Sequence, residues 1–521
     1  MKTIKKLVLK NFKRFRELEL NFDSELNILV GGNEAGKSSV LQALDIVMSA
    51  SRSKVEALGL ENLFNHECII EYLAGARDVA DLPEMFIEAY MSGVADPDFD
   101  GRNNSKNRDE VGIKLVCKPV DKFSAQIKAI LSEDHESFPF EYYTIHFQTF
   151  TDDPIIPHKK PLKHVLLDSA QINNEYATNA YTRAMYAAHA SVVERNLHGF
   201  EYRRAKSKFR DEILKPINET LDTYKFDVRT SPRASLETDI IITEDDIPID
   251  RKGKGRQCFI KTEFALRDRE QTLDVLLLEE PENHLSPVHM KKLIERIRSS
   301  KQKQLFIATH SSFIATRLNL KKVLILSEEK PTEPAVLKDL RKDTAEFFMK
   351  APDNNILELV LCKKAMLVEG DAEFILIDAL YKNALPGAST DDDGIHVISV
   401  DGTSFKRYLE LAELLGIRVA AIRDNDHDYQ TNCVENYKDY VSKSIKIFSD
   451  EDNSRHTFEI CLYQDNKQIC DHEFLGGRAK LTVQEFMIKN KTDAAFQLLE
   501  KHGGKLTPPA YIKRAVEWIR A

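Results

Sequence analysis

Residues 31–38 read GGNEAGKS and set the architecture of the N-terminal half of this chain. They match the pattern G-x-x-x-x-G-K-S, whose glycines let the backbone curl around a phosphate group. An apolar run, Leu26–Val30, precedes the octet, and apolar residues follow it at helical spacing over 40–47. A strand, a glycine-rich turn and a helix N-terminus in this order point backbone amides at an anion. The sequence therefore predicts a nucleotide-phosphate site at this turn.

The residues of this turn have distinct expected roles in binding ATP. Lys37 is expected to contact the β and γ phosphates, and the Ser38 hydroxyl is expected to bind Mg²⁺. The other residues expected to line the nucleotide supply backbone or small polar groups, and they are Gly31, Asn33, Gly36 and Ser39.

A second half of the site is expected far downstream, where the apolar run Leu276–Leu278 ends in Glu279 and Glu280. Glu279 is expected to hold the water shell of the magnesium ion, and Glu280 to polarise the attacking water. Another apolar run, Leu305–Ala308, is followed by His310, which we expect to sense the γ phosphate. Taken singly, a solvated carboxylate pair and a core histidine are the alternatives; their order after the glycine-rich turn favours the site.

The C-terminal third carries another set of carboxylates at the ends of predicted strands. One apolar strand leads to Glu369, with Glu373 four residues further on the first turn of a predicted helix. A second apolar strand leads to Asp424 and Asp426, alternate residues that point the same way on an extended backbone. Adjacent parallel strands would bring these four acids to one sheet edge. Such a concentration of negative charge predicts a site for Mg²⁺ or Mn²⁺.

The order of the N-terminal motifs resembles that of ABC-type ATPases of the DNA-maintenance kind, in which a long insertion separates the two halves of the site. The resemblance implies a signature loop at 253–257, whose Gly255 would contact the nucleotide of the opposite subunit in a head-to-tail dimer. A plain basic turn is the alternative. Gln148 is the candidate Q-loop residue, and a glutamine at a strand edge is the alternative.

The C-terminal carboxylates resemble those of a Toprim domain, the metal-dependent fold of topoisomerases, primases and certain nucleases. An ABC-type ATPase followed by a Toprim domain is the layout of the OLD (overcoming lysogenization defect) family nucleases, and the resemblance runs from Met1 to about Ala495. It implies Glu485 as a further metal ligand and Lys491 as the residue that stabilises the transition-state phosphate, with Lys489 as a rival. A solvated helix face explains these last residues equally well.

The sequence thus predicts an α/β protein with two parts. Residues 1–350 are expected to form the ABC-type P-loop ATPase domain, with a helical, dimerising insertion at about 160–230. Residues 351–521 are expected to form the Toprim domain, and the Lys-, Glu- and Pro-rich stretch Ser327–Asp353 is expected to link the two. Within the insertion and beyond it, further strands are expected near Asp239–Thr243 and Phe259–Phe264.

The function implied by the resemblance is an ATP-regulated DNA endonuclease, active in anti-phage defence. Phosphodiester cleavage would be two-metal hydrolysis, and the acids expected to hold Mg²⁺ or Mn²⁺ are Glu369, Glu373, Asp424, Asp426 and Glu485. One alternative is an ATPase sensor or scaffold whose Toprim half restrains a partner without cutting. Another is a RecF- or SMC-like repair ATPase, which is disfavoured because Leu167–His198 is too short for a long coiled-coil arm. Tyr429 lies on the metal loop itself, which argues against strand passage.

Composition limits these interpretations. The chain has 521 residues, of which 42% are hydrophobic and 30% charged, enough apolar material to exclude a disordered chain. The sequence contains no run of about 18 uncharged apolar residues, so no membrane span is predicted. Seven cysteines without a C-x-x-C pair argue against a zinc finger or a disulfide framework, so a reducing cytoplasm is expected.

The net charge is −9, yet a local basic cluster is enough for a nucleic-acid contact. Such clusters occur at Lys2–Arg16, 203–210 and Lys291–Lys303, where solvated helix faces are the alternative. The expected partners are DNA, further copies of the chain as a homodimer or larger oligomer, and a second defence protein or a nucleic-acid regulator. No membrane partner is expected.

Overall fold

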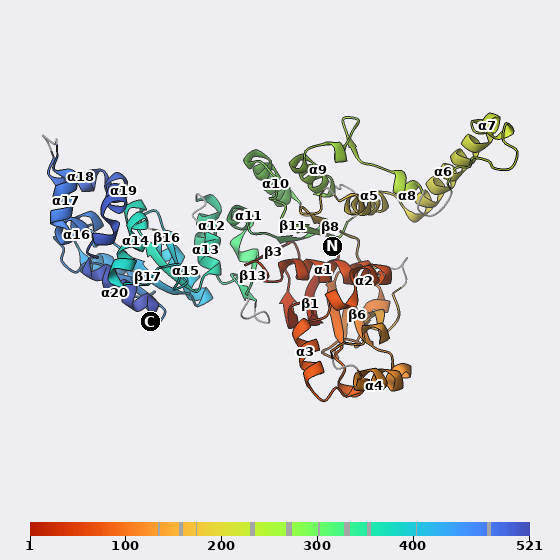
Figure 1. The fold of residues 1–521 in the computed structure, drawn as a ribbon, viewed down its shortest axis with the longest axis horizontal. Coiled ribbons are helices and arrows are strands. Elements are labelled where there is room, and N and C mark those ends of the chain that lie inside the picture. The colour runs from red at the N-terminus through yellow and green to blue at the C-terminus, as the bar shows by residue number, and fades with distance from the viewer. Residues whose placement is uncertain are drawn as a thin grey trace. The chain divides into compact units, whose positions relative to one another are not determined.

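The structure is a computed structural model in which the chain divides into two compact units (Figure 1). The first unit comprises Met1–His310 and Lys322–Pro334, and the second comprises Ser311–Lys321 and Ala335–Ala521. The structure describes residues 1–133, 136–155, 160–172, 174–229, 235–266, 273–300, 303–327, 334–351, 356–402, 404–476 and 481–521. Parts of the expected linker, Ser327–Asp353, therefore lie outside the described residues.

The first unit contains an antiparallel sheet with the order β2-β1-β4-β6-β5, in which β7 also pairs with β6. Its strands are β1 Thr3–Phe12, β2 Phe15–Asn21, β4 Met85–Ser92, β5 Asp100–Gly101, β6 Glu110–Pro119 and β7 Tyr143–Thr149. Apolar and polar residues alternate along β2, because one face of the sheet packs on the core and the other meets solvent.

A second, parallel sheet in this unit has the strand order β13-β3-β12-β11-β8. Its strands are β3 Leu26–Gly31, β8 His164–Asp168, β11 Val275–Glu279, β12 Gln304–Ala308 and β13 Val323–Leu326. Strands β11, β12 and β13 are almost wholly apolar, as expected of strands buried on both faces. In register, Glu279 pairs with Ala308 on one side and with Asp168 on the other. All three predicted parts of the ATP site thus follow strands of one sheet.

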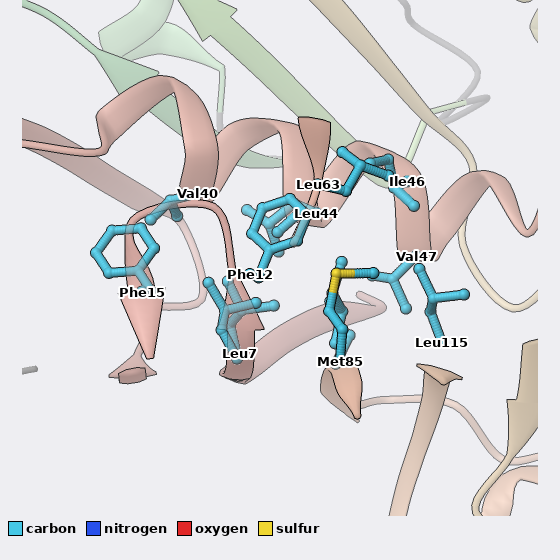
Figure 2. Packing of buried hydrophobic residues seen from close by; sticks show 14 of the residues in the cluster. Leu7, Phe12, Phe15, Val40, Leu44, Ile46, Val47, Leu63, Met85 and Leu115 are labelled. Carbon is cyan, nitrogen blue, oxygen red and sulfur yellow. The ribbon is translucent and has the colours of Figure 1, made fainter. Parts of the chain in front are cut away.

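Helix α1 (Lys37–Ser49) contacts strands of both sheets and buries nearly its whole length. Figure 2 shows Val40 and Leu44 from α1 in one hydrophobic cluster with Phe12 from β1 and Met85 from β4. These four side chains are fully buried, so α1 is fixed by the core on the side away from the glycine-rich turn. Burial of each such side chain stabilises the fold by about 1.5–3 kcal/mol.

The other helices of the first unit include the predicted helical insertion. They are α2 Arg52–Leu58, α3 His66–Ala74, α4 Ser124–Glu133, α5 Glu175–His189, α6 Val192–Glu212, α7 Lys215–Glu219, α8 Leu236–Asp239, α9 Lys254–Leu266 and α10 Pro287–Ser299. Helix α6 buries none of its residues and, with α7, extends away from the sheets of this unit (Figure 1). A small hairpin, β9 Thr243–Glu244 and β10 Ile247–Pro248, precedes α9.

The strand expected at Phe259–Phe264 is wrong, because these residues lie in α9. The buried positions of this helix, among them Cys258, Thr262 and Ala265, recur at helical spacing. The short apolar run is compatible with the period of a strand or with that of a helix. Packing against α10 and β8 favours the helix.

The second unit is built on a parallel sheet with the order β16-β15-β17-β18. Its strands are β15 Lys364–Val368, β16 Ile395–Ser399, β17 Arg418–Ile422 and β18 Ile445–Phe448. Its helices are α11 Ser312–Leu318, α12 Lys342–Lys350, α13 Ile356–Leu361, α14 Asp371–Ala384, α15 Phe405–Leu415, α16 Phe458–Asp465, α17 Lys467–Phe474, α18 Val483–Lys489, α19 Lys491–His502 and α20 Ala510–Arg520.

This unit begins before residue 351, since α11 and α12 belong to it. The buried carboxylate of Glu410 on α15 accepts hydrogen bonds from the Arg341 backbone amide at 2.7 Å and from the Thr344 hydroxyl at 2.6 Å. The start of α12 is therefore anchored to the Toprim half. Among the helices in the described ranges, none combines the length and the apolar character needed to cross a membrane.

Candidate ATP site and candidate metal centre

Lys37 is the first residue of α1, and its buried ammonium group is held by the glycine-rich turn. Its Nζ donates hydrogen bonds to the carbonyl oxygens of Gly31 and Gly32, each at 2.9 Å. Gly36, just before the helix, has φ 96°, in the left-handed region that glycine adopts without a steric penalty. A Cβ added there would lie 2.3 Å from the Phe15 ring, so both conformation and space require glycine. Asn33 and Ser38 are exposed at the same turn.

The carboxylate of Glu279 meets the turn from the end of β11. The Ser38 side chain hydrogen-bonds to it, which joins the two halves of the site that are far apart in the sequence. Burial raises the pKa of Glu279, and the nearby Asp168 and Glu280 raise it further. This pairing of a hydroxyl with a carboxylate is a suitable donor set for Mg²⁺ beside a phosphate chain.

Glu280 and His310 face each other at the ends of neighbouring strands. Glu280 Oε1 lies 3.3 Å from His310 Nε2, and Glu280 Oε2 accepts a hydrogen bond from Asn283 at 2.8 Å. Glu280 has φ 45°, a strained conformation for a residue other than glycine, and its amide donates to Ala308 O at 2.8 Å. The turn after β11 is thus tied to the end of β12.

Glu282 makes a second link between these strand ends, which sequence reasoning missed. Its Oε1 accepts hydrogen bonds from the Thr309 hydroxyl at 2.5 Å and from the His310 backbone amide at 3.0 Å. Thr309 is fully buried, and burial raises the pKa of Glu282. The sequence did contain a signal for this role. Residues 279–282 read Glu-Glu-Pro-Glu, and three acids after a buried strand are more than one magnesium ion requires, so one of them has another task.

Two basic residues on the turn between β1 and β2 also lie at the ATP site. A Cβ at Gly36 would come within 2.8 Å of Arg14, and Lys13 interacts electrostatically with Glu279. Burial lowers the pKa of Lys13. Both residues fall inside the basic run Lys2–Arg16 that the sequence offered only as a nucleic-acid surface. No pattern in the sequence separates them from the rest of that run.

Gly255 and Gln148 lie on other elements than the residues described so far. Gly255 lies in the first turn of α9, where an added Cβ would be 2.1 Å from the carbonyl oxygen of His284. The expected signature loop is therefore packed closely against the turn that follows β11. Gln148 lies on β7 and donates to Asp152 Oδ1 at 2.6 Å. The contact of Gly255 with a second subunit and the Q-loop role of Gln148 stay predictions.

In the second unit, the carboxyl ends of β15 and β17 bring three of the predicted acids together. Glu369 Oε2 accepts a hydrogen bond from the Asp424 backbone amide at 3.3 Å. Burial raises the pKa of Glu373 to about 7, and Glu369 adds to this shift. Burial raises the pKa of Asp424 to about 9, and the like charges of Glu373 and Glu369 add to this shift. The pKa of Glu369 is raised as well, chiefly by burial.

A fourth acid, Glu459, lies in this cluster and was missed by sequence reasoning. It is 3% exposed at the start of α16, and its Oε2 is buried without a hydrogen-bond partner. Its Oε1 lies 3.1 Å from Lys491 Nζ, and it interacts electrostatically with Asp424 and Glu373. An acid in the apolar run Thr457–Leu462 was the available signal, since a charged residue is rarely buried without a partner.

Lys491 is the cation of the cluster. Its pKa is raised by Glu459 first and then by Asp424 and Glu373, against the opposing effect of burial. Its rival Lys489 is the last residue of α18. The structure therefore brings Lys491 beside these acids at the start of α19, and its role at the phosphate stays a prediction.

Asp426 and Glu485 have other surroundings. Asp426 is exposed, has φ 48°, and lies 3.2 Å from the Arg423 guanidinium. Glu485 forms a capping box with Thr482 at the start of α18: its Oε2 accepts from the Thr482 amide at 2.8 Å, and its own amide donates to the Thr482 hydroxyl. This bonding lowers the pKa of Glu485. Glu485 thus serves a helix N-terminus, and its role as a metal ligand stays a prediction.

The residues present fit a divalent cation. Glu369, Glu373, Asp424 and Glu459 offer carboxylate oxygens that Lys491 and Arg423 offset only in part, and Oε2 of Glu459 is buried without a hydrogen-bond donor. Hard oxygen donors of this kind bind Mg²⁺ or Mn²⁺. Without a cation, raised pKa values are the only way this cluster can reduce its repulsion.

Fold and sites together define a P-loop ATPase joined to a Toprim domain. The family model described as AAA ATPase domain matches residues 1–225 and 120–315, and the model described as overcoming lysogenization defect protein-like, TOPRIM domain matches residues 360–426. The chain belongs to the AAA ATPase domain family, and its second unit carries a Toprim domain of the overcoming lysogenization defect kind. These matches confirm the predicted fold class and the resemblance.

Relatives and solved structures match parts of the chain. It is 27% identical over 241 residues to structural maintenance of chromosomes protein 6 of Saccharomyces cerevisiae, covering 42% of this chain and 20% of that protein. It is 27% identical over 109 residues to the DNA replication and repair protein RecF of Synechococcus sp., covering 21% of this chain and 28% of that protein. The chain therefore spans well under half the length of these curated relatives.

Among solved structures, the C-terminal region of the Xanthomonas campestris pv. campestris OLD protein matches with a TM-score of 0.21 and 23% identity. The match covers 30% of this chain and 94% of that one.

Proposed function

We propose that this protein is a divalent-cation-dependent DNA endonuclease whose Toprim domain is regulated by its ATPase domain. The observation that carries the proposal is the buried cluster of Glu369, Glu373, Asp424 and Glu459, which Lys491 and Arg423 offset only in part. A purely structural role does not account for this cluster, because an uncompensated group of buried acids destabilises a fold.

At the metal centre, Glu369, Glu373, Asp424 and Glu459 would hold Mg²⁺ or Mn²⁺, with Asp426 at the exposed rim. Two such ions supply an activated water and charge stabilisation of the leaving oxygen. The Lys491 ammonium, already turned to these acids, would offset the charge that develops on the phosphate during cleavage. The side chains position the ions; the ammonium supplies the fixed positive charge.

At the ATP site, Lys37 would neutralise the phosphates, and Ser38 with Glu279 would hold Mg²⁺. Glu280 would orient the attacking water and accept its proton at Oε1, where it now faces His310. Lys13 and Arg14 add positive charge beside the turn. We infer that nucleotide turnover regulates cleavage rather than powering it, since phosphodiester hydrolysis needs no energy input.

DNA as the substrate is supported by two kinds of observation. Both curated relatives carry names that refer to chromosome maintenance or to DNA replication and repair. The exposed helix α6 carries the basic run 203–210, which offers charge for a phosphate backbone. A role in anti-phage defence and a homodimer or larger oligomer are proposed from the resemblance to the overcoming lysogenization defect proteins.

The test is incubation of the purified chain with supercoiled plasmid DNA in Mg²⁺ or Mn²⁺, with and without ATP. We expect nicked or linear plasmid from the parent and intact plasmid from the double variant Asp424→Ala with Asp426→Ala. Turnover of ATP without any cleavage, by a protein that binds its cation, would replace the nuclease with the sensor or scaffold alternative.

A further inference from the structure

A second group of metal-ligand side chains lies in the Toprim half, at the far end of the helix that carries Lys491. His472 lies in the last turn of α17 with Glu473 beside it, and His502 is the last residue of α19. One ligand atom from each of the three residues lies within 4.8 Å of the other two. At a rise of about 1.5 Å per residue, His502 is roughly 16 Å along α19 from Lys491. This group is therefore distinct from the carboxylate cluster.

Two ligand atoms of this group already have the spacing of ligands around a bound ion. Glu473 Oε2 lies 3.3 Å from His502 Nε2, and the two side chains are only 10% and 18% exposed. Adjacent ligand atoms around a tetrahedral zinc ion are about 3.3 Å apart, given metal–ligand distances near 2.0–2.1 Å. The ring of His472 stands perpendicular to that of His502 with centroids 6.3 Å apart, and it is exposed, so a change of rotamer brings its nitrogen to the ion.

The surroundings supply a second layer of support. Lys501 forms an ion pair with Glu473 through Oε1, the oxygen that does not face His502. A ligating carboxylate is usually held in place by a second polar partner, as Lys501 holds Oε1 here, and the ion would replace the present contact of Oε2 with His502 Nε2. Both α17 and α19 end here, and the carbonyl groups at a helix C-terminus favour a cation.

The ligand chemistry selects the ion. Two imidazoles and one carboxylate suit borderline-soft ions such as Zn²⁺, whereas Mg²⁺ and Ca²⁺ prefer sets made wholly of oxygen. The group joins α17 and α19, two helices that pack in the core of this unit around Phe474 and Leu498. A bound ion would therefore tie two helix ends together across the chain that runs between them.

We propose that His472, Glu473 and His502 form a zinc-binding site that ties the C-terminal turn of α17 to that of α19. The fourth position of the ion is left to water, because His472 lies on the surface. The site goes beyond the proposed nuclease function and does not depend on it. Its structural consequence is a fixed end for the helix whose other end carries Lys491.

The test is zinc binding by the full chain, measured by isothermal titration calorimetry after treatment with a chelator and its removal. The background carries Asp424→Asn and Asp426→Asn, so that the carboxylate cluster contributes little to the signal. We expect one site per chain that His472→Ala or His502→Ala weakens by more than about a hundredfold, because loss of a direct ligand costs more than loss of an outer partner. Zinc should also raise the midpoint of thermal unfolding, and either variant should abolish that rise.

His396→Ala is the matched control. His396 is exposed and pairs with Glu358 at 3.0 Å, but it belongs to no three-ligand group among the residues that the structure describes. We expect zinc affinity to be unchanged in this variant, and circular dichroism to show that all three variants fold. Zinc binding that is absent from the background protein, or that survives both His472→Ala and His502→Ala, would overturn the proposal. Because the background already lacks two catalytic acids, either result leaves the nuclease proposal untouched.

Discussion

Two parallel sheets in this chain end in buried or half-buried acids, Glu279 and Glu280 in the first unit and Glu369 and Asp424 in the second. At the ATP site each acid has its own partner, since Ser38 bonds to Glu279 and Glu280 faces His310. At the metal centre several acids share one lysine, and the pKa of Asp424 rises to about 9. The carboxyl edge of a parallel sheet thus carries a different kind of site in each unit. In the first unit each acid is paired with a side chain of the site, and in the second the acids depend on an added cation.

The largest expected effect tests whether the two sites are chemically independent. Lys37→Ala removes the ammonium that faces the phosphates and should abolish ATP binding, while Glu280→Gln should keep binding and block turnover. Asp424→Ala with Asp426→Ala should abolish DNA cleavage and leave ATP hydrolysis at the parent rate. The measurements are phosphate release, nucleotide binding and plasmid cleavage for all three proteins.

Two outcomes of that experiment would change the assignment. Turnover at the parent rate by Glu280→Gln would move the catalytic role to Glu279. Parent levels of cleavage by the double aspartate variant would remove the Toprim centre as the nuclease. Lys37→Ala fixes the sign of the coupling, because cleavage is lost if ATP activates the nuclease and is released if bound ATP restrains it.

The next effect sharpens the membership of the metal centre. Glu459 is buried among the acids, whereas Glu485 caps α18. Glu459→Gln should lower cleavage by about two to three orders of magnitude, the range found when a preorganised electrostatic group is removed from an active site. Glu485→Gln should leave cleavage within about twofold, because a neutral amide oxygen still caps the helix. A plasmid cleavage time course in Mn²⁺ measures both, and the reverse pattern would restore Glu485 as the ligand.

The candidate residues that the sequence could place at the two sheet edges lie next to strand ends in short, local patterns. Lys37 and Asp424 follow apolar runs directly, so period and turn chemistry place them at the edges of the two sheets. Glu459 could not be placed in this way, because it lies on α16 beyond another strand and reaches the cluster only through the tertiary fold. Lys13 could not be placed for the same reason. Its turn meets the glycine-rich turn only after β1 has paired with β4 and α1 has packed against their sheet.

At Glu485 the structure shows a local use for the side chain, and its role as a metal ligand stays a prediction. The pattern Thr482-Val-Gln-Glu485 begins a helix, and a capping box uses its glutamate locally. A residue that already satisfies a helix N-terminus gains little from also binding an ion. The family resemblance gave no physical reason to prefer it over the buried acid in the run Thr457–Leu462.

A third experiment contrasts Asp424 with Asp45, a buried aspartate whose charge is fully paired. Asp45 on α1 lies 2.9 Å from His164 Nε2 and also pairs with Lys54, and these partners lower its pKa to about 2 despite burial. The pKa is below its ordinary value of 3.8, so the stabilisation is complete above pH 4 and declines as pH falls towards 2. Asp45→Asn should cost roughly 2 kcal/mol at pH 7 and about half as much at pH 3.

The free energy of unfolding of the first unit, measured in urea at the two pH values, checks this expectation. Asp109→Asn is the control, because Asp109 pairs with Arg102 on the surface and its loss should change stability little. A cost for Asp45→Asn that does not change between pH 7 and pH 3 would mean that the paired charge is not its source.

The smallest effect concerns Glu282, the carboxylate that ties the turn after β11 to the end of β12 at the ATP site. Because one of its oxygens holds both the Thr309 hydroxyl and the His310 amide, it fixes the position of His310 opposite Glu280. Glu282→Ala should lower kcat for ATP hydrolysis about tenfold, or roughly 1.4 kcal/mol, and leave KM within twofold. Glu282→Gln should restore most of kcat, since an amide oxygen accepts the same two hydrogen bonds and brings no charge near Glu280. Steady-state kinetics of the two variants separate positioning from charge: equal losses in both would show that the negative charge of Glu282 acts directly, and no loss in either would remove it from the site.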